Sequence, residues 1–238
     1  MAKKATLGVC STGSRLKLAA SCGETIFSAQ KKILNQEKPL FAMLARLLKR
    51  AGAGGLANVK IFCAVRGPGR FTGIRIGLTL AKVLGVMTGA KVFSATLFEI
   101  MALQAFESEA FKGFRARCKK PLIAALMRAF KDEYFCQVFY AGPRLRGPRP
   151  AGAPQWLKAQ EMKDYLSALG PGVFVIGDSE EDPSVYDLAP ALSAKAGAKI
   201  SRVLPDYVIK TALALKNVSA EPLYLKPARY EMTVPGRR

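Results

Sequence analysis

Histidine, the residue that most often moves protons or holds zinc, does not occur in this 238-residue chain. Its absence removes the usual zinc sites and the Ser/His and Cys/His nucleophile pairs. The five cysteines are scattered and form no CxxC pair: Cys10, Cys22, Cys63, Cys118 and Cys136. An odd number of cysteines without a secretion signal is typical of reduced thiols, and we expect them to be small buried residues. The chain could still be an enzyme, but fewer kinds of chemistry are open to it.

The carboxylates offer two candidate groups. Asp132 and Glu133 are adjacent, so on one strand their side chains would point to opposite faces and could not act together as acid and base. We therefore expect a solvated turn after Lys131. The acidic run at 178–182 (DSEED) could bind a cation, but such runs are more often solvated loops, which is the interpretation we favour.

The segment that carries most information is residues 61–77, IFCAVRGPGRFTGIRIG. A strand leads into a glycine turn, and a helix begins directly after it. Gly67 and Gly69 can adopt positive φ, and Thr72 is a plausible N-cap. The free N–H groups of the helix start, with Arg70 and Arg75, could cradle an anion. Alternatively the turn is only tight, and Gly73 and Gly77 let the helix lie against its neighbour; both interpretations stay open. No GK[ST] follows, so this is not a P-loop.

The elements around this segment predict an α/β protein. In the first half, strands are expected at 6–9, 15–20, 24–28, 59–65 and 91–94, and helices at 40–51, 72–87 and 96–106. In the second half, strands are expected at 122–127, 134–140 and 173–176, and helices at 159–168 and 206–215. The Gly/Pro/Arg-rich stretch 142–154 is not expected to form regular structure. We place a domain boundary near 104–112, which gives subdomains 1–106 and 107–238.

The net charge of +20 suggests a polyanionic partner, of which nucleic acid is the commonest. The best candidates for an RNA-facing surface are five basic residues: Lys119, Lys120, Arg144, Arg146 and Arg149. The alternative is a charged loop without a partner. No apolar run reaches the length of a membrane span and no signal peptide is recognisable, so we expect a cytoplasmic protein that does not associate with membranes.

The helix at 40–51 is amphipathic. Its apolar face carries Leu40, Leu44, Leu47 and Leu48, which recur at i, i+4, i+7 and i+8. This face packs either into the core of the subunit or against a partner. The sequence does not separate the two.

The glycine segment matches the pattern GPGxFTGxRxG, which is the hallmark of the TsaB/YeaZ family. The matching residues are Gly67, Pro68, Gly69, Phe71, Thr72, Gly73, Arg75 and Gly77. The order and spacing of the rest also resemble that family, most weakly at 142–200. The resemblance implies an actin-like ATPase (ribonuclease H-like) fold with two subdomains and a degenerate active site. It also allows the last helix of the smaller, basic C-terminal subdomain to pack back on the first.

Two positions depart from the family pattern. Cys10 stands where the family has the aspartate of its first hairpin, and Arg128 aligns with the aspartate of its DAR segment. Phosphoryl transfer needs Mg²⁺ held by oxygen ligands, which these side chains cannot supply. We therefore expect no catalytic residue, cofactor or metal in this chain, with ATP or ADP and metal on partner subunits.

The resemblance implies a non-catalytic scaffold or activator subunit of the complex that forms threonylcarbamoyladenosine in tRNA. Its partners would be a TsaD-like catalytic subunit, a TsaE-like ATPase and tRNA, with a homodimer possible when the chain is alone. The interface with the partner would use Leu40, Leu44, Leu47, Leu48, Gly73 and Gly77. The alternatives are an active small-molecule kinase or ATPase of the actin-like superfamily, and a stand-alone tRNA-binding protein.

Overall fold

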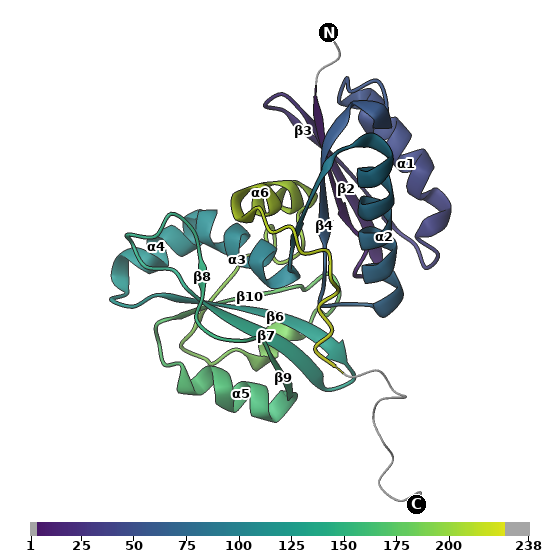
Figure 1. Ribbon diagram of the computed structural model, residues 1–238. Helices are drawn as coiled ribbons and strands as arrows, with labels where there is room; N and C mark the ends of the chain where they lie inside the picture. Colours follow the sequence, from purple (N-terminus) through teal and green to yellow (C-terminus); the bar gives the residue numbers. More distant parts are fainter. Residues whose placement is uncertain (1–3, 227–238) are drawn as a thin grey trace, which may run out of the picture.

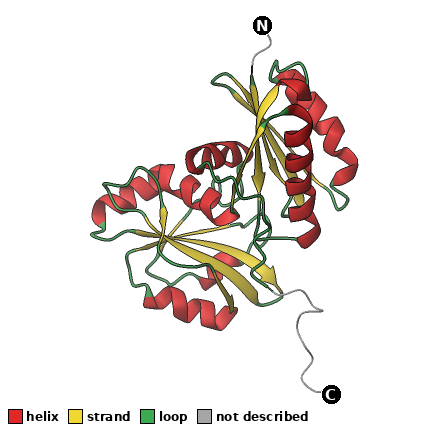
Figure 2. Cartoon of the chain, in the orientation of Figure 1, coloured by secondary structure: helices red, strands yellow, loops and turns green. Residues whose placement is uncertain are grey.

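The computed structural model describes residues 4–226, which form two β-sheets with helices on both faces of each (Figures 1 and 2). The first sheet has the order β3-β2-β1-β4-β5. Its strands are β1 (Ala5–Cys10), β2 (Arg15–Cys22), β3 (Ile26–Lys32), β4 (Val59–Val65) and β5 (Lys91–Ala95). Strands β1, β4 and β5 are parallel, and β2 and β3 run antiparallel to their neighbours.

Three helices cover this first sheet: α1 (Glu37–Arg50), α2 (Phe71–Thr88) and α6 (Pro205–Leu215). Helices α1 and α2 share one face, where the leucines of α1 join a core with Leu7, Leu16 and Phe62. Helix α6 lies on the opposite face, although it comes from the end of the chain (Figure 1). It packs so closely on β1 that a Cβ on Gly8 would lie 2.8 Å from Ile209.

The second sheet has the order β11-β10-β6-β7-β8, with β9 also paired to β7. Its strands are β6 (Leu122–Phe130), β7 (Glu133–Tyr140), β8 (Arg149–Pro150), β9 (Gln155–Lys158), β10 (Val173–Gly177) and β11 (Ala194–Lys195). Helices α3 (Leu97–Glu107) and α4 (Glu109–Arg117) cover one face, and α5 (Ala159–Ala168) with a short 3-10 turn (Val185–Leu188) covers the other. Helices α3 and α6 contact each other between the two sheets.

The expected fold class, α/β, is confirmed, and most elements lie where the sequence predicts them. Helix α3 begins with the capping box formed by Thr96 and Glu99, which satisfies two N–H groups of its first turn. The division at 106 and 107 stays a prediction.

Several details of the sequence prediction were wrong. Thr72 is not an N-cap: α2 begins one residue earlier, after Arg70, whose side chain makes no capping bond. Helix α4 and strand β9 were not predicted, and the stretch 142–154 does contain the short edge strand β8. For α4 a local signal was overlooked, the N-cap Ser108, whose hydroxyl accepts the Phe111 N–H. The short strands β8 and β9 depend on pairing with β7, which local patterns do not signal.

Helix α2 also contradicts the expectation that no segment is long and apolar enough for a membrane span. In length and composition it passes that test, the one helix among residues 4–226 to do so. The core helix of a soluble protein passes the same test, and one side of α2 is packed on the first sheet.

Candidate functional site

The glycine turn after β4 packs against the turn that joins β1 to β2. A Cβ on Gly69 would lie 2.6 Å from the carbonyl oxygen of Thr12, and a Cβ on Gly73 would lie only 1.9 Å from that of Ser11. The Arg70 N–H donates to the Thr12 oxygen at 2.7 Å, and the Ser11 hydroxyl donates to the Gly73 oxygen at 2.7 Å. Only glycine fits at such distances. Of the two interpretations of this segment, the geometry therefore supports close packing over an anion cradle.

Two other motif residues hold the C-terminal part of the chain. The Arg75 guanidinium lies 3.8 Å from the centre of the Phe71 ring, and its Nε donates to the Tyr224 hydroxyl at 3.1 Å. The rings of Phe71 and Tyr224 stack with their centres 5.0 Å apart. Next to them, the Leu223 N–H donates to the Arg66 oxygen at 2.7 Å. Phe71 and Arg75 thus fasten residues 223–224 beside the glycine turn, a role that the sequence did not signal.

A cavity of about 410 Å³ lies between the two halves, at the carboxyl ends of β1, β4, β6 and β10. The wall from the first half comes from the β1–β2 hairpin and the glycine turn, and the wall from the second half from the end of β6 and the loop after β10. Its charged lining consists of five cations and two carboxylates: Arg15, Lys17, Arg70, Arg128, Lys131, Asp178 and Glu181. The two positions that depart from the family pattern, Cys10 and Arg128, both line this cavity.

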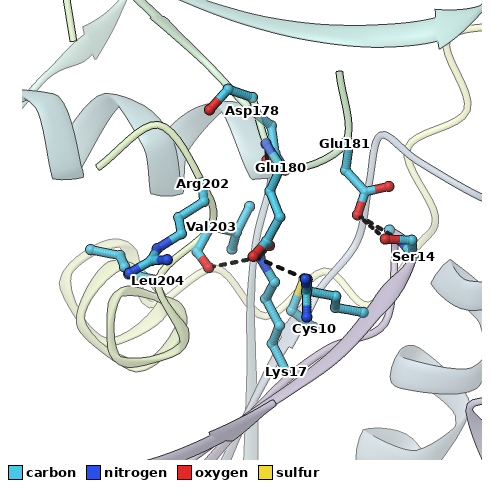
Figure 3. A network of polar contacts seen from close by, with 12 residues as sticks. Cys10, Ser14, Lys17, Asp178, Glu180, Glu181, Arg202, Val203 and Leu204 are labelled. Atoms are coloured by element: carbon cyan, nitrogen blue, oxygen red, sulfur yellow. Dashed lines mark hydrogen bonds and ion pairs between the residues drawn. The ribbon is translucent and has the colours of Figure 1, made fainter. Parts of the chain in front are cut away.

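The acidic run after β10 is not the solvated loop that the sequence favoured. Its carboxylates reach across to the β1–β2 hairpin (Figure 3). Glu180 forms ion pairs with Lys17 at 2.5 Å and with Arg15 at 3.0 Å. Glu181 accepts hydrogen bonds from the Ser14 N–H at 2.8 Å and hydroxyl at 2.7 Å. The sequence could not reveal these partners, because they lie more than 160 residues away.

Lys17 is the centre of this network, and its side chain is 4% exposed. Besides the Glu180 pair, its ammonium donates to the carbonyl oxygen of Val203 at 3.0 Å. Burial raises the pKa of the Asp178 carboxyl to about 6, against the attraction of Lys17 and with repulsion from Glu181 and Glu180. Burial also raises the pKa of the Cys10 thiol, although Lys17 opposes this. Cys10 is therefore a protonated thiol near neutral pH.

On the opposite wall, Arg128 and Lys131 lie at the β6–β7 turn. The Arg128 Nε donates to the Lys131 oxygen at 2.9 Å, and its Nη1 lies 3.6 Å from the buried carboxylate of Asp182. The expected turn is present at Lys131 and Asp132, with a φ of 51° at Lys131. Glu133 is not part of a solvated turn: it begins β7 and forms an ion pair with Lys226. Within residues 4–226 no group of three or more His, Cys, Asp or Glu side chains is placed to hold a metal ion.

The four leucines proposed for a partner interface are all inside the subunit. Leu40, Leu44, Leu47 and Leu48 are at most 3% exposed, and Gly73 and Gly77 face Ser11. The assignment of these residues to a surface was wrong, because the apolar face of α1 packs on the first sheet. The apolar surface of α1 and α2 is instead made by other side chains, here called the α1–α2 face: Phe41, Phe71, Ile76, Val83, Val86 and Met87. Part of this face is a groove of about 540 Å³.

The five basic residues proposed to face RNA are all exposed. Lys119 and Lys120 precede β6, and Arg144 and Arg146 follow β7, whose end pairs with the start of β6. Arg149 in β8 pairs with Tyr140 at the same end. The structure therefore brings the five together at one end of the second sheet, and in the described part of the chain none of them is within 4.0 Å of a carboxylate. Contact with RNA stays a prediction.

No protein-family model matches this chain, and no curated protein sequence does. Among solved structures, it is similar to YeaZ from Pseudomonas aeruginosa, with a TM-score of 0.70 and 21% identity over 93% of this chain and 100% of that one. A second structure, described as an uncharacterised protein similar to peptidase YeaZ from Pseudomonas aeruginosa, gives a TM-score of 0.72 and 22% identity over 94% of this chain and all of the other. The two-sheet α/β architecture with its central cavity is thus a known fold. It is the fold of the YeaZ structures.

Proposed function

We propose that this chain belongs to the TsaB/YeaZ family and is a non-catalytic scaffold or activator subunit of a threonylcarbamoyl transferase complex. In this role it binds a TsaD-like catalytic subunit, which acts with a TsaE-like ATPase and attaches threonylcarbamoyl to the adenosine beside the tRNA anticodon. The complex acts in the cytoplasm. The observation that carries the proposal is the fold shared with YeaZ over nearly the whole of both chains, together with the motif GPGxFTGxRxG.

The non-catalytic role is supported by the chemistry of the cavity. Glu180 is paired with Lys17 and Arg15, Glu181 is held by Ser14, and Asp178 does not belong to any group of three possible metal ligands in residues 4–226. Arg128 on the other wall would repel a divalent cation. The metal and the nucleotide of the reaction are therefore assigned to the partners.

The α1–α2 face is the proposed surface for the TsaD-like partner, or for a second copy when the chain is alone. Val86 and Met87 are 87% and 74% exposed, and Phe41 is 60% exposed. Large apolar side chains gathered on one face are typical of protein interfaces. The expected interface thus moves from the inner leucines of α1 to the outer side of the same two helices.

The test is affinity capture of the TsaD-like protein of the same organism, followed by reconstitution of tRNA modification with and without this chain. We expect a stable complex and modification that depends on the chain, while the isolated chain does not hydrolyse ATP. The double variant Phe41→Ser/Val86→Ser should lose the complex but keep its fold, and Lys49→Ser/Lys82→Ser on the same helices serves as the control. Equal modification without the chain, or ATP turnover by the chain alone, would refute the proposal.

The basic residues at the end of the second sheet are proposed to position tRNA through its phosphates. Replacing Arg144, Arg146 and Arg149 by Gln should weaken association of the complex with tRNA. The slope of log K against log salt should become shallower by roughly one unit for each phosphate that the variant no longer neutralises. An unchanged slope would count against this surface.

A further inference from the structure

The central cavity has no part in the scaffold function proposed above, yet it has the position of a ligand site. It opens at the carboxyl ends of β1, β4, β6 and β10, where open α/β sheets usually bind their ligands. Its volume of about 410 Å³ lies in the range of small-molecule pockets, about 300–1,000 Å³. Both halves of the molecule contribute to its walls, so a ligand could contact the two together.

The charges of the cavity are not evenly compensated. Of the two carboxylates in the lining, Glu181 is held by Ser14, and Asp178 is buried beside Lys17 and accepts the Glu180 N–H at 3.2 Å. At the rim, Arg70 from the first half and Lys131 from the second form no ion pair with any residue in 4–226. Arg128 has one carboxylate, Asp182, at 3.6 Å. The rim therefore presents cations that can pair with a ligand anion.

The rest of the lining is apolar. Leu97, Met127, Phe135 and Val203 are buried side chains on the inner wall, and Phe130 is half-exposed beside Lys131. An inorganic anion has no apolar part that could pack against these side chains. A ligand with a charged group at the rim and an apolar or aromatic part on the inner wall would use both.

Within residues 4–226 no group of three or more His, Cys, Asp or Glu side chains is placed to hold a metal ion, so the charge of such a ligand would be balanced by the basic side chains. From this arrangement we propose that the cavity binds a small organic phosphate directly through Arg70, Arg128 and Lys131, without a divalent cation. Arginine is suited to this because its guanidinium donates several hydrogen bonds to phosphate oxygens. The site binds its ligand and performs no chemistry on it.

The test is calorimetric titration of the full chain with phenyl phosphate and with adenosine monophosphate, in EDTA and in MgCl₂. We expect saturable binding of one molecule per chain that is the same in both buffers. Inorganic phosphate and phenol, which each supply half of the ligand, should bind at least tenfold more weakly. No saturable binding of either organic phosphate, or binding that needs Mg²⁺, would overturn the proposal.

Variants locate the site. Arg70→Gln with Lys131→Asn should weaken binding at least tenfold, and asparagine is chosen because it tolerates the positive φ at 131. The charge-matched control Lys49→Gln/Lys82→Gln changes exposed residues of α1 and α2 outside the cavity and should change affinity less than twofold. Circular dichroism checks that both variants fold. Equal weakening in the two would show only general attraction to a basic protein and would also overturn the proposal.

Discussion

The packing of the glycine motif predicts that Gly73→Ala strongly destabilises the protein. The new Cβ would lie 1.9 Å from the Ser11 oxygen, whereas ordinary contact begins at 3.4 Å, so the Ser11 carbonyl must move by about 1.5 Å. Backbone atoms make this clash, and overpacking of this kind costs about 1–3 kcal/mol or more. The movement would also strain the bonds from Ser11 to Gly73 and from Arg70 to Thr12, at about 1 kcal/mol each.

Against this, alanine favours a helix over glycine by about 1 kcal/mol. The net loss in unfolding free energy is therefore about 2–4 kcal/mol. Gly77→Ala should cost less, because the one close contact of its Cβ is the Ser11 hydroxyl at 2.8 Å, a side-chain atom that can rotate away at the cost of its hydrogen bond to Gly73. Gly113→Ala in α4 is the matched control: its Cβ would meet no atom within 4 Å, so it should stabilise by about 0.5–1 kcal/mol.

Urea denaturation followed by circular dichroism measures all three variants. The expected order of stability is Gly113→Ala, then wild type, then Gly77→Ala, then Gly73→Ala. If Gly73→Ala remained within about 0.5 kcal/mol of wild type, the β1–β2 turn would not hold the motif as described, and the anion-cradle interpretation would regain its place.

Three further predictions concern other parts of the molecule. Asp178→Asn removes a carboxyl whose pKa is about 6 in the folded protein, against an ordinary value of 3.8. The unfolding free energy of the wild type relative to the variant should therefore fall, by at most about 3 kcal/mol, as the pH rises from 4 to 7. A difference in unfolding free energy that does not vary with pH in urea titrations would contradict this. Thr96→Ala breaks the capping box of α3 and should cost about 1 kcal/mol, measured in the same way; no loss would show that the cap is redundant. Leu47→Ala should lower the unfolding free energy by about 2–5 kcal/mol and Phe41→Ala by less than about 1 kcal/mol, because of these two side chains Leu47 is in the core and Phe41 is exposed. Equal losses of stability would refute the assignment of the α1–α2 face as surface.

Local patterns predicted the fold better than they predicted the cavity. The alternation of strands and helices, the spacing of the α1 leucines and the Thr96 cap each depend on residues close in sequence, and all lie where expected. The same spacing could not decide between core and interface, since an apolar helix face looks alike in both. In the structure the apolar face of α1 packs on the first sheet and is part of the core.

The contacts around the cavity depend on residues far apart in the chain, and no local pattern signals them. Lys17 looks like an ordinary strand lysine, and nothing nearby in sequence indicates that Glu180 and Val203 surround it. The acidic run has the composition of a solvated loop, but its partners are on the first hairpin. The departures from the family pattern at Cys10 and Arg128 did identify two cavity residues, through the resemblance and not through local chemistry.

The placement of α6 has a consequence for how the protein is made. The first sheet is complete once residue 95 has been synthesised, but the helix that covers its second face ends at Leu215. During synthesis on the ribosome the second face of the first sheet therefore stays without α6, either exposed or bound by a chaperone, until the whole of the second sheet has been made. A gene fragment that stops after residue 106 would encode a sheet with one bare apolar side, so expression trials of the first half alone should yield aggregated material unless residues 205–215 are supplied with it.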